Sequence, residues 1–446
     1  MSQRNVVVIG AGMAGLAAAR WLAAHDLAVT VFERGDRVGG RVRTDNVGGV
    51  QIDLGAQILA RFGVHTHRLF ADVGLAPDLL RKPSLSGIAR AGHIYELKPS
   101  LSSLLSGLLS PLGKATFLKL PIPLLSHWSE LDVYDLGKAA PFDTGSLAAY
   151  ARRVLDDEVL EYLLQPLLSG LLYWTPERTS EVMLLLLMKV GSAGFDYDTV
   201  HGGLAQLPEA AARSLDVYCD SAVTRVTRDG ADGYTVFART RGEERAFPAA
   251  GVVCATSAGA VPQLFPDLDP AQHEFFDAIT YSSTAVAVVG LKQRLPISRF
   301  SVFFPRREAK HAAAVTIAAN KDLSAPPLDG DTIQIYASGP SARDLLERDD
   351  VTIRDTLWSD LQRAGLIQDF DSSATFWYVH RWPLALPEFD VGHFRRLKAF
   401  ADGTIESGRI VFAGDYLGGP YVEGAVYSGE RAAERLLQRL ESAPAT

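Results

Sequence analysis

The feature that most constrains the fold of this chain is its first stretch, where a strand pattern meets a glycine fingerprint. Four β-branched residues, Val6 to Ile9, lead directly into the run from Gly10 to Gly15, and an alanine-rich helical pattern follows. Gly10 suits a tight turn out of the strand, Gly12 lets backbone approach a pyrophosphate, and Gly15 lets the helix pack close to the strand. The helix N-terminus then presents free N–H groups to phosphates. The stretch therefore predicts a βαβ unit that binds a dinucleotide.

The residues after the fingerprint extend this prediction. A second apolar run, 28–32, ends in Glu33, 18 residues beyond Gly15, where a carboxylate can accept hydrogen bonds from ribose hydroxyls. Residues 34–43 hold two adjacent glycines flanked by arginines, which suits the other side of the pyrophosphate. Residues 51–57 predict a short strand and a glycine turn that brings backbone close to a planar ring. The fingerprint and Glu33 by themselves fit NAD as well as FAD.

Composition excludes several other classes of protein. A chain of 446 residues suggests two or three domains. The net charge is −8 and no long basic run occurs, so nucleic-acid binding is not expected. The two cysteines, Cys219 and Cys254, are far apart and outside any CxxC pattern, which predicts no metal site and no disulfide and fits a reducing cytoplasm. No stretch approaches the roughly 20 apolar residues of a transmembrane helix.

The middle of the chain is rich in leucine. Leucines are dense in 101–125, and 147–190 has strong helical periodicity. Two interpretations remain open at this point. The leucines could form the core of a helical subdomain. Alternatively, they could line an apolar entrance for a lipophilic substrate or form a patch that rests on a membrane.

The second half of the chain predicts mainly strands and closes with another strand–turn–helix. The segments 221–227, 234–239 and 251–256 are expected to form a small sheet that returns the chain to the nucleotide domain, and strands at 284–291 and 332–337 belong to a mixed sheet. A helical pattern follows at 341–365. At the C-terminus, a strand over 409–415 ends in an acid, and a helix begins after a glycine turn and runs to about residue 440. This second helix start predicts a site for an anion or polar ring atoms.

In these motifs the chain resembles the flavin amine oxidases and protoporphyrinogen oxidases, with phytoene desaturases as more distant relatives. The resemblance extends over nearly the whole chain, and the order and spacing of the motifs carry it. The motifs are Gly10 to Gly15, Glu33, Gly39-Gly40-Arg41, Asp53-Leu54-Gly55, Gly202-Gly203-Leu204, Ala222-Val223, Ala255-Thr256, Gly414-Asp415 and Glu423-Gly424-Ala425.

The resemblance implies an α/β fold with a Rossmann-like FAD-binding domain, a mixed-sheet substrate domain and a helical insertion. The FAD-binding domain is expected in three parts, residues 1–96, 201–265 and 401–446. The helical insertion spans 97–200, and the sheet and helices of the substrate domain span 266–400.

The resemblance also implies FAD, bound non-covalently because neither cysteine lies where mammalian monoamine oxidases carry covalent flavin. Backbone at Val223 is expected at the adenine, and Asp415 near the ribityl–phosphate region. Backbone at Val422 and Ala425 would stabilise negative charge at the N1–C2=O edge of the flavin. The residues expected to bind FAD are Gly10, Gly12, Met13, Ala14, Gly15, Glu33, Arg34, Gly40, Arg41, Gly55, Ala56, Gln57, Val223, Gly414, Asp415, Val422 and Ala425.

The branch of the family is less defined than the cofactor. Residues 165–171 and 382–387 are similar to the porphyrinogen-oxidising branch, whereas 421–425 is closer to the monoamine oxidases, where a tyrosine forms one wall of an aromatic cage. The lysine near flavin N5 that is common in amine oxidases has no counterpart in 281–290, and Lys292 lies at the strand's end. We expect Tyr421, with Tyr173 and Trp174, to face the substrate.

These observations predict an FAD-dependent oxidoreductase that dehydrogenates a lipophilic ring substrate, namely a porphyrinogen, a pyrrole or a cyclic amine. Hydride transfer to flavin N5 needs little acid–base machinery, and we assign no catalytic acid or base. Because no second glycine fingerprint occurs in mid-chain, the expected acceptor is oxygen or a quinone. An oxidase of primary or secondary amines and a non-catalytic flavin-binding protein are the alternatives. A cytoplasmic protein, with or without peripheral contact to the inner membrane, and a homodimer both fit the family.

Overall fold

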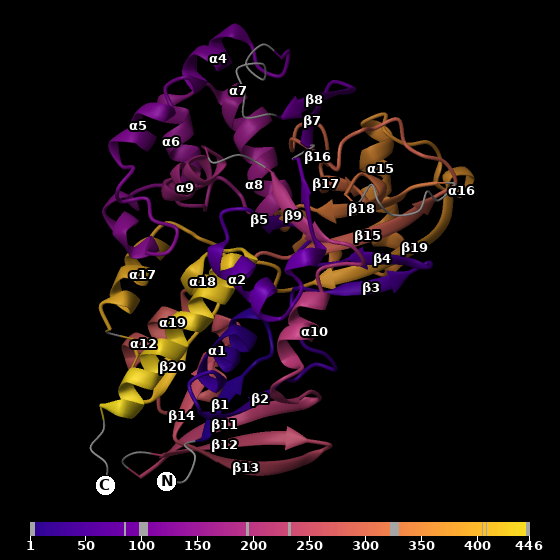
Figure 1. Cartoon of the computed structure of the whole chain (residues 1–446). Helices are drawn as coiled ribbons and strands as arrows, with labels where there is room; N and C mark the ends of the chain where they lie inside the picture. The colour runs from indigo at the N-terminus through magenta and orange to yellow at the C-terminus, as the bar shows by residue number, and fades with distance from the viewer. Residues whose placement is uncertain are drawn as a thin grey trace.

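The computed structural model places two sheets and a helical region around one cavity (Figure 1). It describes residues 5–83, 86–97, 106–192, 196–230, 233–321, 330–403, 405–406 and 408–442. In Figure 1 the helices of the middle region lie above the N-terminal sheet, and the larger sheet lies to their right. The structure has the α/β fold that the sequence predicts.

A five-stranded parallel sheet forms the centre of the N-terminal part. Its strands lie in the order β10-β2-β1-β14-β20, with parallel pairing throughout. Val6, Val7 and Val8 in the central strand are fully buried, since helices and strands cover both faces of the sheet, and a strand buried on both sides needs a continuous apolar run. The strands are β1 (Asn5–Ile9), β2 (Ala28–Phe32), β10 (Asp216–Tyr218), β14 (Gly251–Cys254) and β20 (Ile410–Phe412).

The first and last long helices pack against each other over this sheet. Helix α1 (Met13–Ala23) follows the glycine fingerprint, and α19 (Val422–Glu441), yellow in Figure 1, runs beside it. A Cβ placed on Gly429 would lie 2.1 Å from the carbonyl oxygen of Ala14, so only glycine permits this crossing. The contact joins the two ends of the chain.

The antiparallel sheet β11-β12-β13 packs on the other face of the parallel sheet. Its strands are β11 (Ser221–Asp229), β12 (Gly233–Thr240) and β13 (Glu243–Ala249). Val236 of β12 shares one apolar cluster with Val7 and Val252 of the parallel sheet. The segment predicted at 251–256 differs from the expectation: it is a strand, but it joins the parallel sheet, because all four residues of β14 are buried between two covered faces.

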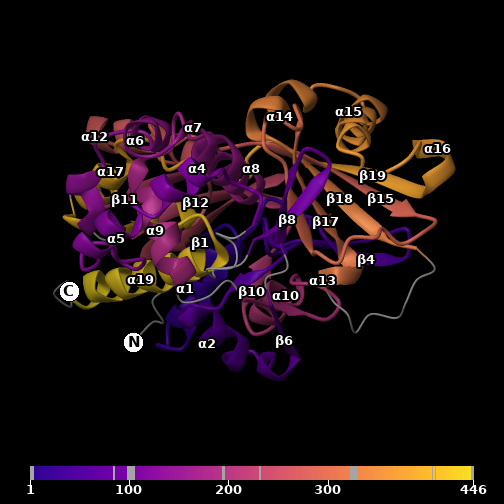
Figure 2. The ribbon, with the colours of Figure 1, turned by 90° about the horizontal axis from the view of Figure 1, so that it is seen from above.

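A seven-stranded mixed sheet lies beside the parallel one, in the order β19-β15-β18-β17-β16-β7-β8. Alternate residues of β15 point to opposite faces, with Val286 and Val288 toward the helical region and Ala285 and Ala287 toward α15. Figure 2 shows α14 and α15 along one side of this sheet. The elements are β7 (Ser86–Arg90), β8 (His93–Leu97), β15 (Thr284–Leu291), β16 (Ser301–Phe303), β17 (Ala312–Ile317), β18 (Thr332–Ala337), β19 (Ala374–Trp382), α14 (Gly339–Leu345) and α15 (Asp350–Arg363).

Two details of this region differ from the sequence-based picture. Strand β7 and all but the last residue of β8 fall within the range 1–96 assigned to the cofactor domain, yet β7 pairs in parallel with β16 of the seven-stranded sheet. The helical pattern at 341–365 forms two helices, because α14 ends at Leu345 and the side chain of Asp349 caps the start of α15.

The leucine-rich region is mainly helical where the structure describes it, and residues 101–105 lie outside the described part. Its helices are α4 (Pro111–Phe117), α5 (Pro121–Ser126), α6 (Leu147–Val154), α7 (Asp157–Val159), α8 (Gln165–Leu172) and α9 (Glu181–Ser192). In the described ranges we find no helix with the length and apolar character needed to cross a bilayer.

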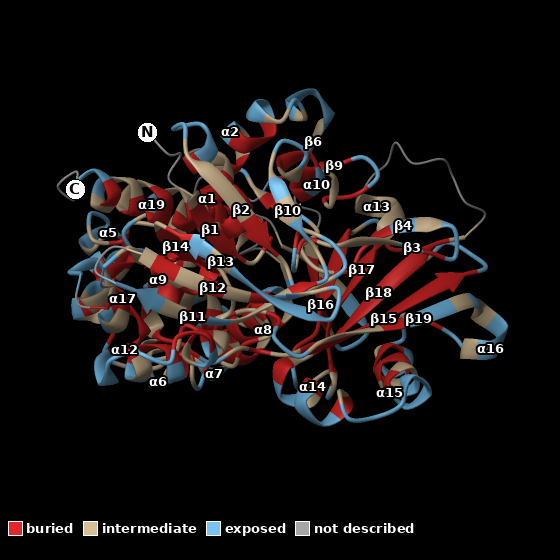
Figure 3. Cartoon of the chain, turned by 90° about the horizontal axis from the view of Figure 1, so that it is seen from below, coloured by how far each residue is buried: buried red, intermediate tan, exposed pale blue. Residues whose placement is uncertain are grey.

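Shorter elements connect these layers, and strands β15, β17 and β18 at the centre of the seven-stranded sheet are buried along their whole length (Figure 3). The connecting elements are β3 (Thr44–Val47), β4 (Val50–Asp53), β5 (Leu59–Ala60), β6 (Leu79–Lys82), β9 (Tyr197–Val200), α2 (Val64–Asp72), α10 (Gln206–Ala212), α11 (Val261–Leu264), α12 (Pro270–Asp277), α13 (Ala318–Lys321), α16 (Phe370–Ser373), α17 (His393–Ala401), α18 (Asp415–Gly418), η1 (Ala76–Asp78), η2 (Leu136–Phe142), η3 (Leu160–Leu164) and η4 (Ala258–Ala260).

Candidate active site

A large cavity of 1820 Å³ begins at the carboxyl ends of the parallel strands and continues between the helical region and the seven-stranded sheet. This edge is where open parallel sheets bind their ligands. The volume exceeds the range of roughly 300–1000 Å³ that is common for a single small-molecule site. The cavity therefore has room for a dinucleotide and a second molecule.

The glycine fingerprint forms one end of the cavity. Gly10 has φ +99° and turns the chain out of β1, while Gly12 has no atom within 4 Å of where a Cβ would stand. The N-terminus of α1 has no side-chain cap, so its first N–H groups remain available to a ligand. Gly15 lies behind this surface, where a Cβ would sit 1.9 Å from the Gly10 carbonyl oxygen, which is the close helix–strand packing expected of this position.

Glu33 is held rigidly beside the fingerprint. Its two carboxylate oxygens accept hydrogen bonds from the backbone N–H of Ala11 and of Gly35, both at 2.8 Å. Each oxygen keeps a further lone pair for a hydroxyl donor. The carboxylate is thus oriented before any ribose arrives.

Arg41 and Asp415 form an ion pair in the cavity wall, in which the carboxylate is buried and the Arg41 side chain is 35% exposed. The guanidinium donates to both carboxylate oxygens, at 2.6 and 2.9 Å, and to the carbonyl of Ala385 at 2.9 Å. Burial works to lower the pKa of Arg41, but the charge and hydrogen bonds of Asp415 raise it overall. The pair connects the segment after β2 to the end of β20.

The start of α19 closes the far end of the site. Val422 and Ala425 line the cavity, and the helix has no side-chain cap. Gly424 packs tightly on the preceding turn, because a Cβ there would lie 2.4 Å from the Gly418 and Gly419 carbonyl oxygens.

Glu423, which belongs to the same motif, points away from the cavity. Its carboxylate accepts hydrogen bonds from the backbone N–H groups of His65 and Thr66 and from the hydroxyls of Thr66 and Tyr134, at 2.7 to 2.9 Å. Glu423 therefore caps the N-terminus of α2 from a distant part of the chain.

The structure brings nearly all the predicted site residues to this one cavity. Tyr421 and Tyr173 line it, and Tyr421 meets Phe62 edge-on at 5.4 Å between ring centroids. Trp174 does not line it, because its ring is 1% exposed and stacks on Phe389 in the core. The predicted cofactor residues at the cavity are Gly10, Gly12, Met13, Ala14, Glu33, Arg34, Gly40, Arg41, Gly55, Ala56, Gln57, Val223, Gly414, Asp415, Val422 and Ala425.

The second half of the cavity is walled mainly by apolar side chains. Both interpretations of the leucines hold in part, because most of the leucines that line the cavity also belong to one core cluster, whereas Leu171 lines the cavity outside that cluster. Sequence reasoning missed the sheet side of this wall, where Phe300, Phe303 and Tyr336 lie. The lining leucines are Leu97, Leu108, Leu109, Leu120, Leu147, Leu163, Leu164, Leu167, Leu168, Leu171, Leu184 and Leu187.

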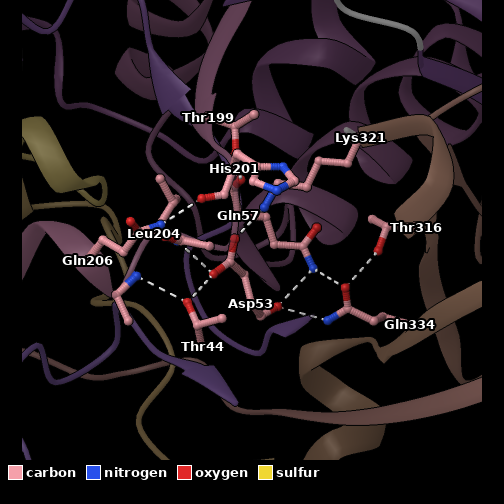
Figure 4. A network of polar contacts seen from close by, with 12 residues as sticks. Thr44, Asp53, Gln57, Thr199, His201, Leu204, Gln206, Thr316, Lys321 and Gln334 are labelled. Atoms are coloured by element: carbon pink, nitrogen blue, oxygen red, sulfur yellow. Dashed lines mark hydrogen bonds and ion pairs between the residues drawn. The ribbon is translucent and has the colours of Figure 1, made fainter. Parts of the chain in front are cut away.

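A buried polar network beside the cavity joins the β3-β4 pair of strands to the seven-stranded sheet (Figure 4). The Asp53 carboxylate forms an ion pair with Lys321 and accepts hydrogen bonds from the Thr44 hydroxyl at 2.5 Å and the Leu204 N–H at 2.9 Å. Its backbone carbonyl accepts from Gln334 of β18 at 2.8 Å. This network fixes the turn after β4, including Gly55, relative to the seven-stranded sheet.

Two histidines have strongly lowered pKa values. Burial, with a smaller effect of the Arg43 charge, lowers the pKa of His380 at the cavity to about 4. Burial and the Arg396 charge lower the pKa of His393 to about 3. Both rings are neutral near pH 7.

The residues present fit an extended dinucleotide better than a metal ion. The described residues contain no group of three or more His, Cys, Asp or Glu side chains that could hold a metal. Two uncapped helix starts face the same cavity, one at each end, and Gly12 leaves open the space that a side chain would fill. This arrangement suits a pyrophosphate at α1 and a polar ring edge at α19.

Comparisons with known proteins agree with this geometry. Protoporphyrinogen oxidase 2, chloroplastic/mitochondrial, of Arabidopsis thaliana is 24% identical over 99% of this chain and 95% of its own. Putrescine oxidase of Kocuria rosea is 30% identical over 52% of this chain and 51% of its own. The crystal structure of a putative protoporphyrinogen oxidase from Exiguobacterium sp. 255-15 superposes with a TM-score of 0.76 at 22% identity, covering 99% of this chain and 100% of that chain. The family model for flavin containing amine oxidoreductases matches residues 13–437, so the chain belongs to this family of FAD-dependent oxidoreductases.

Proposed function

We propose that this enzyme holds FAD non-covalently along the cavity and dehydrogenates a lipophilic ring compound, with a porphyrinogen as the leading substrate. When bound, FAD supplies a ring that accepts a hydride from a substrate C–H bond. The N-terminus of α1 and Gly12 would hold the pyrophosphate, and Glu33 the adenosine ribose. The start of α19 would lie at the reacting ring. These contacts would come from three segments of the chain: 1–96 without β7 and β8, 201–265, and 401–446.

The observation that carries the substrate proposal is the apolar half of the cavity. Its walls are mainly leucine and phenylalanine, which exclude water and favour a large apolar ring. The acids at this end are already paired: Glu96 with Arg299 at 2.8 Å, and Asp196 with Arg61 at 3.2 Å. A protonated amine would therefore find no uncompensated carboxylate among the described residues of this wall. The relatedness over nearly the whole chain to a protoporphyrinogen oxidase supports the same proposal.

The test is anaerobic reduction of the purified flavoprotein. Protoporphyrinogen IX is expected to bleach the flavin within catalytic turnover times, and acid is expected to release the flavin into solution. A panel of primary and secondary amines serves as the comparison. Bleaching by amines alone would overturn the porphyrinogen proposal.

The proposed electron acceptor is oxygen or a quinone. The support is the sequence, which holds one strand–GxGxxG–helix fingerprint, at Gly10 to Gly15. Reduced enzyme is expected to be reoxidised by oxygen or by a soluble quinone. Rapid bleaching of the oxidised flavin by NADPH alone would contradict this part of the proposal.

An amine oxidase is the second candidate, and one observation favours it. Tyr421 lines the cavity at the start of α19 and meets Phe62 edge-on at 5.4 Å, which gives two aromatic rings near the proposed reacting end. Aromatic walls attract the cationic or polarised nitrogen of an amine. The amine panel described above decides between the two candidates.

We further infer that α4 and α5 rest on an anionic lipid surface. Phe117 and Leu120 line the cavity from this segment, while exposed apolar side chains of the same segment face outward. Lys119 is exposed beside them. A lipophilic substrate would then reach the cavity from the bilayer. The outward side chains are Leu112, Leu118, Ile122, Leu125 and Trp128.

Co-sedimentation with vesicles of phosphatidylglycerol tests this inference. The holoenzyme is expected to pellet with the vesicles, and the double variant Ile122→Lys, Leu125→Lys is expected to stay in the supernatant. Val351→Lys is the matched control, because Val351 is similarly exposed at 47% but lies on α15, far along the chain. Equal sedimentation of all three proteins would refute the inference.

A further inference from the structure

Glu423 is a buried acid at the second residue of α19, beside the proposed reacting end of the cavity. It is 3% exposed and does not line the cavity, whereas Tyr421, Val422 and Ala425 around it in the sequence do. One turn of helix therefore carries cavity-lining residues on one side and a carboxylate on the other.

The groups around the Glu423 carboxylate are the ones that an ionised carboxylate needs. Oε1 accepts from the His65 N–H at 2.9 Å and the Tyr134 hydroxyl at 2.7 Å. Oε2 accepts from the N–H and the hydroxyl of Thr66, both at 2.7 Å. All four groups donate, and an ionised carboxylate only accepts. Burial and the hydrogen bond to Glu423 raise the pKa of Tyr134, as expected for a phenol that keeps its proton and donates it.

No cationic side chain in the described part of the chain forms an ion pair with Glu423. The His65 ring pairs with Glu430 instead, at 2.5 Å. Compensation comes from the N-terminus of α2, which carries about half a positive charge. Asp415 in the cavity wall is different, because the Arg41 guanidinium neutralises it at 2.6 Å. Glu423 therefore keeps a residual negative charge.

This charge acts on groups at the cavity. Burial raises the pKa of Tyr421, and the charge of Glu423 raises it further. The same field acts on any group that gains negative charge at the start of α19. The first N–H groups of α19, which has no side-chain cap, favour such a charge, and Glu423 opposes it.

We propose that Glu423 sets the reduction potential of the bound flavin by opposing the negative charge that the ring gains at the start of α19. Reduction of the ring takes up two electrons and one proton, together a hydride, and leaves one negative charge on it. The carboxylate makes this uptake less favourable and makes the transfer of electrons to the acceptor more favourable. This inference rests on the proposed function for the placement of FAD, and it is independent of the substrate.

The midpoint potential of the flavin in the holoenzyme tests the proposal. Anaerobic reduction with dithionite in the presence of reference dyes measures it, and no substrate is needed. Glu423→Gln removes the charge and keeps the volume of the side chain and one acceptor oxygen. It is expected to raise the equilibrium constant for two-electron reduction about ten-fold, which is about 30 mV for such a couple.

Thr66→Val changes the same network in the opposite electrostatic sense. It removes the hydroxyl that donates to Oε2 at 2.7 Å and leaves the charge of Glu423 in place. The equilibrium constant is expected to fall about two- to three-fold, because one dipole that screens the carboxylate is lost. Both variants lose stability, since both leave part of the network unsatisfied. A shift caused by loosening alone would therefore have the same sign in both.

Glu430→Gln is the matched control. Glu430 is an acid of the same helix whose side chain is 15% exposed, and it lies seven residues, or about 10 Å, farther along the helix axis. Its replacement is expected to change the equilibrium constant less than about two-fold, because the field of a charge weakens with distance. A shift as large as that of Glu423→Gln would assign the effect to the net charge of the helix and overturn the proposal.

The other outcomes are equally decisive. A potential that is not raised in Glu423→Gln, or not lowered in Thr66→Val, overturns the proposal. If Glu423→Gln does not fold or does not hold FAD, the direction of the shift in Thr66→Val alone decides. Failure of protoporphyrinogen IX to bleach the flavin would refute the proposed substrate and leave these potentials unchanged. A protein that binds no FAD would refute the proposed function and this inference together.

Discussion

His393 shows how a single residue can limit the acid stability of this protein. The ring is fully buried, its Nε2 contacts the Tyr416 carbonyl at 3.0 Å, and its Nδ1 has no hydrogen-bond partner among the described residues. Nε2 must therefore carry the hydrogen, and Nδ1 is an unprotonated nitrogen in an apolar site. A second proton would create an unpaired buried charge.

The pH dependence follows from the lowered pKa of His393. Below pH 6.5 the unfolded chain binds a proton at this ring, whereas the folded chain does not until about pH 3. Stability therefore falls as the pH falls through this window, by about 2 kcal/mol at pH 5 from this group alone. His393→Gln is expected to be less stable than the unaltered protein at pH 7.5 but to lose less stability between pH 7.5 and pH 5.

Urea unfolding of the holoenzyme at the two pH values measures this difference. The quantity of interest is the change in the free energy of unfolding for each protein. An identical change in both proteins would show that His393 is not the group responsible.

At the scale of elements, the structure depends on contacts between segments that are distant in sequence. The N-terminus of α2 has no side-chain cap of its own, and Glu423 of α19 supplies the missing acceptor. The same helix crosses α1 at Gly429 and starts at the cavity with Val422. Helix α19 therefore packs against α1, whose start faces the cavity, and caps the N-terminus of α2.

Glu423→Ala is expected to destabilise the protein by about 2 to 4 kcal/mol, because two backbone N–H groups and two hydroxyls lose a charged acceptor. Hydrogen exchange should accelerate first at the start of α2. Glu434→Ala on the exposed side of the same helix is the control, and a surface pair of this kind is worth at most about 1 kcal/mol. Equal losses in the two variants would contradict the capping role.

At the scale of the whole molecule, the cavity lies between both sheets and the helical region, and the proposed dinucleotide site joins segments from the two ends and the middle of the chain. The fingerprint lies at one end of the sequence, and Asp415 and Val422 lie at the other. The ion pair of Arg41 with Asp415 and the Asp53–Lys321 pair also connect distant segments of the chain around the cavity.

Removal of FAD is therefore expected to lower the melting temperature and to leave a protein that re-stabilises on adding the cofactor. With free FAD at one hundred times its Kd, the gain is about 2.7 kcal/mol. Calorimetry of the apoprotein over a series of FAD concentrations provides the measurement. A melting temperature independent of FAD would show that the dinucleotide does not bind the folded cavity.

Local patterns were sufficient to predict much of the fold and one end of the site. The βαβ unit of Gly10 to Glu33 and the strand and helix around Asp415 depend on backbone geometry and apolar periodicity, which neighbouring residues determine. The residues that meet FAD in the proposed arrangement are mostly backbone groups in such turns. Their positions can therefore be read without knowing the tertiary contacts.

The chain by itself determined that a dinucleotide fold would form and that its family uses FAD, because those properties are carried by short motifs. Only the tertiary structure decided what the leucines of α8 and α9 do, that Trp174 is buried in the core, and that β7 belongs to the seven-stranded sheet. It also brought Gln57 and Tyr336 into contact across 279 positions of sequence. The physical reason is that burial and hydrogen-bond direction depend on partners from distant segments. The local sequence around an apolar or polar side chain fits both a core position and a binding site, and only the distant partners decide between the two.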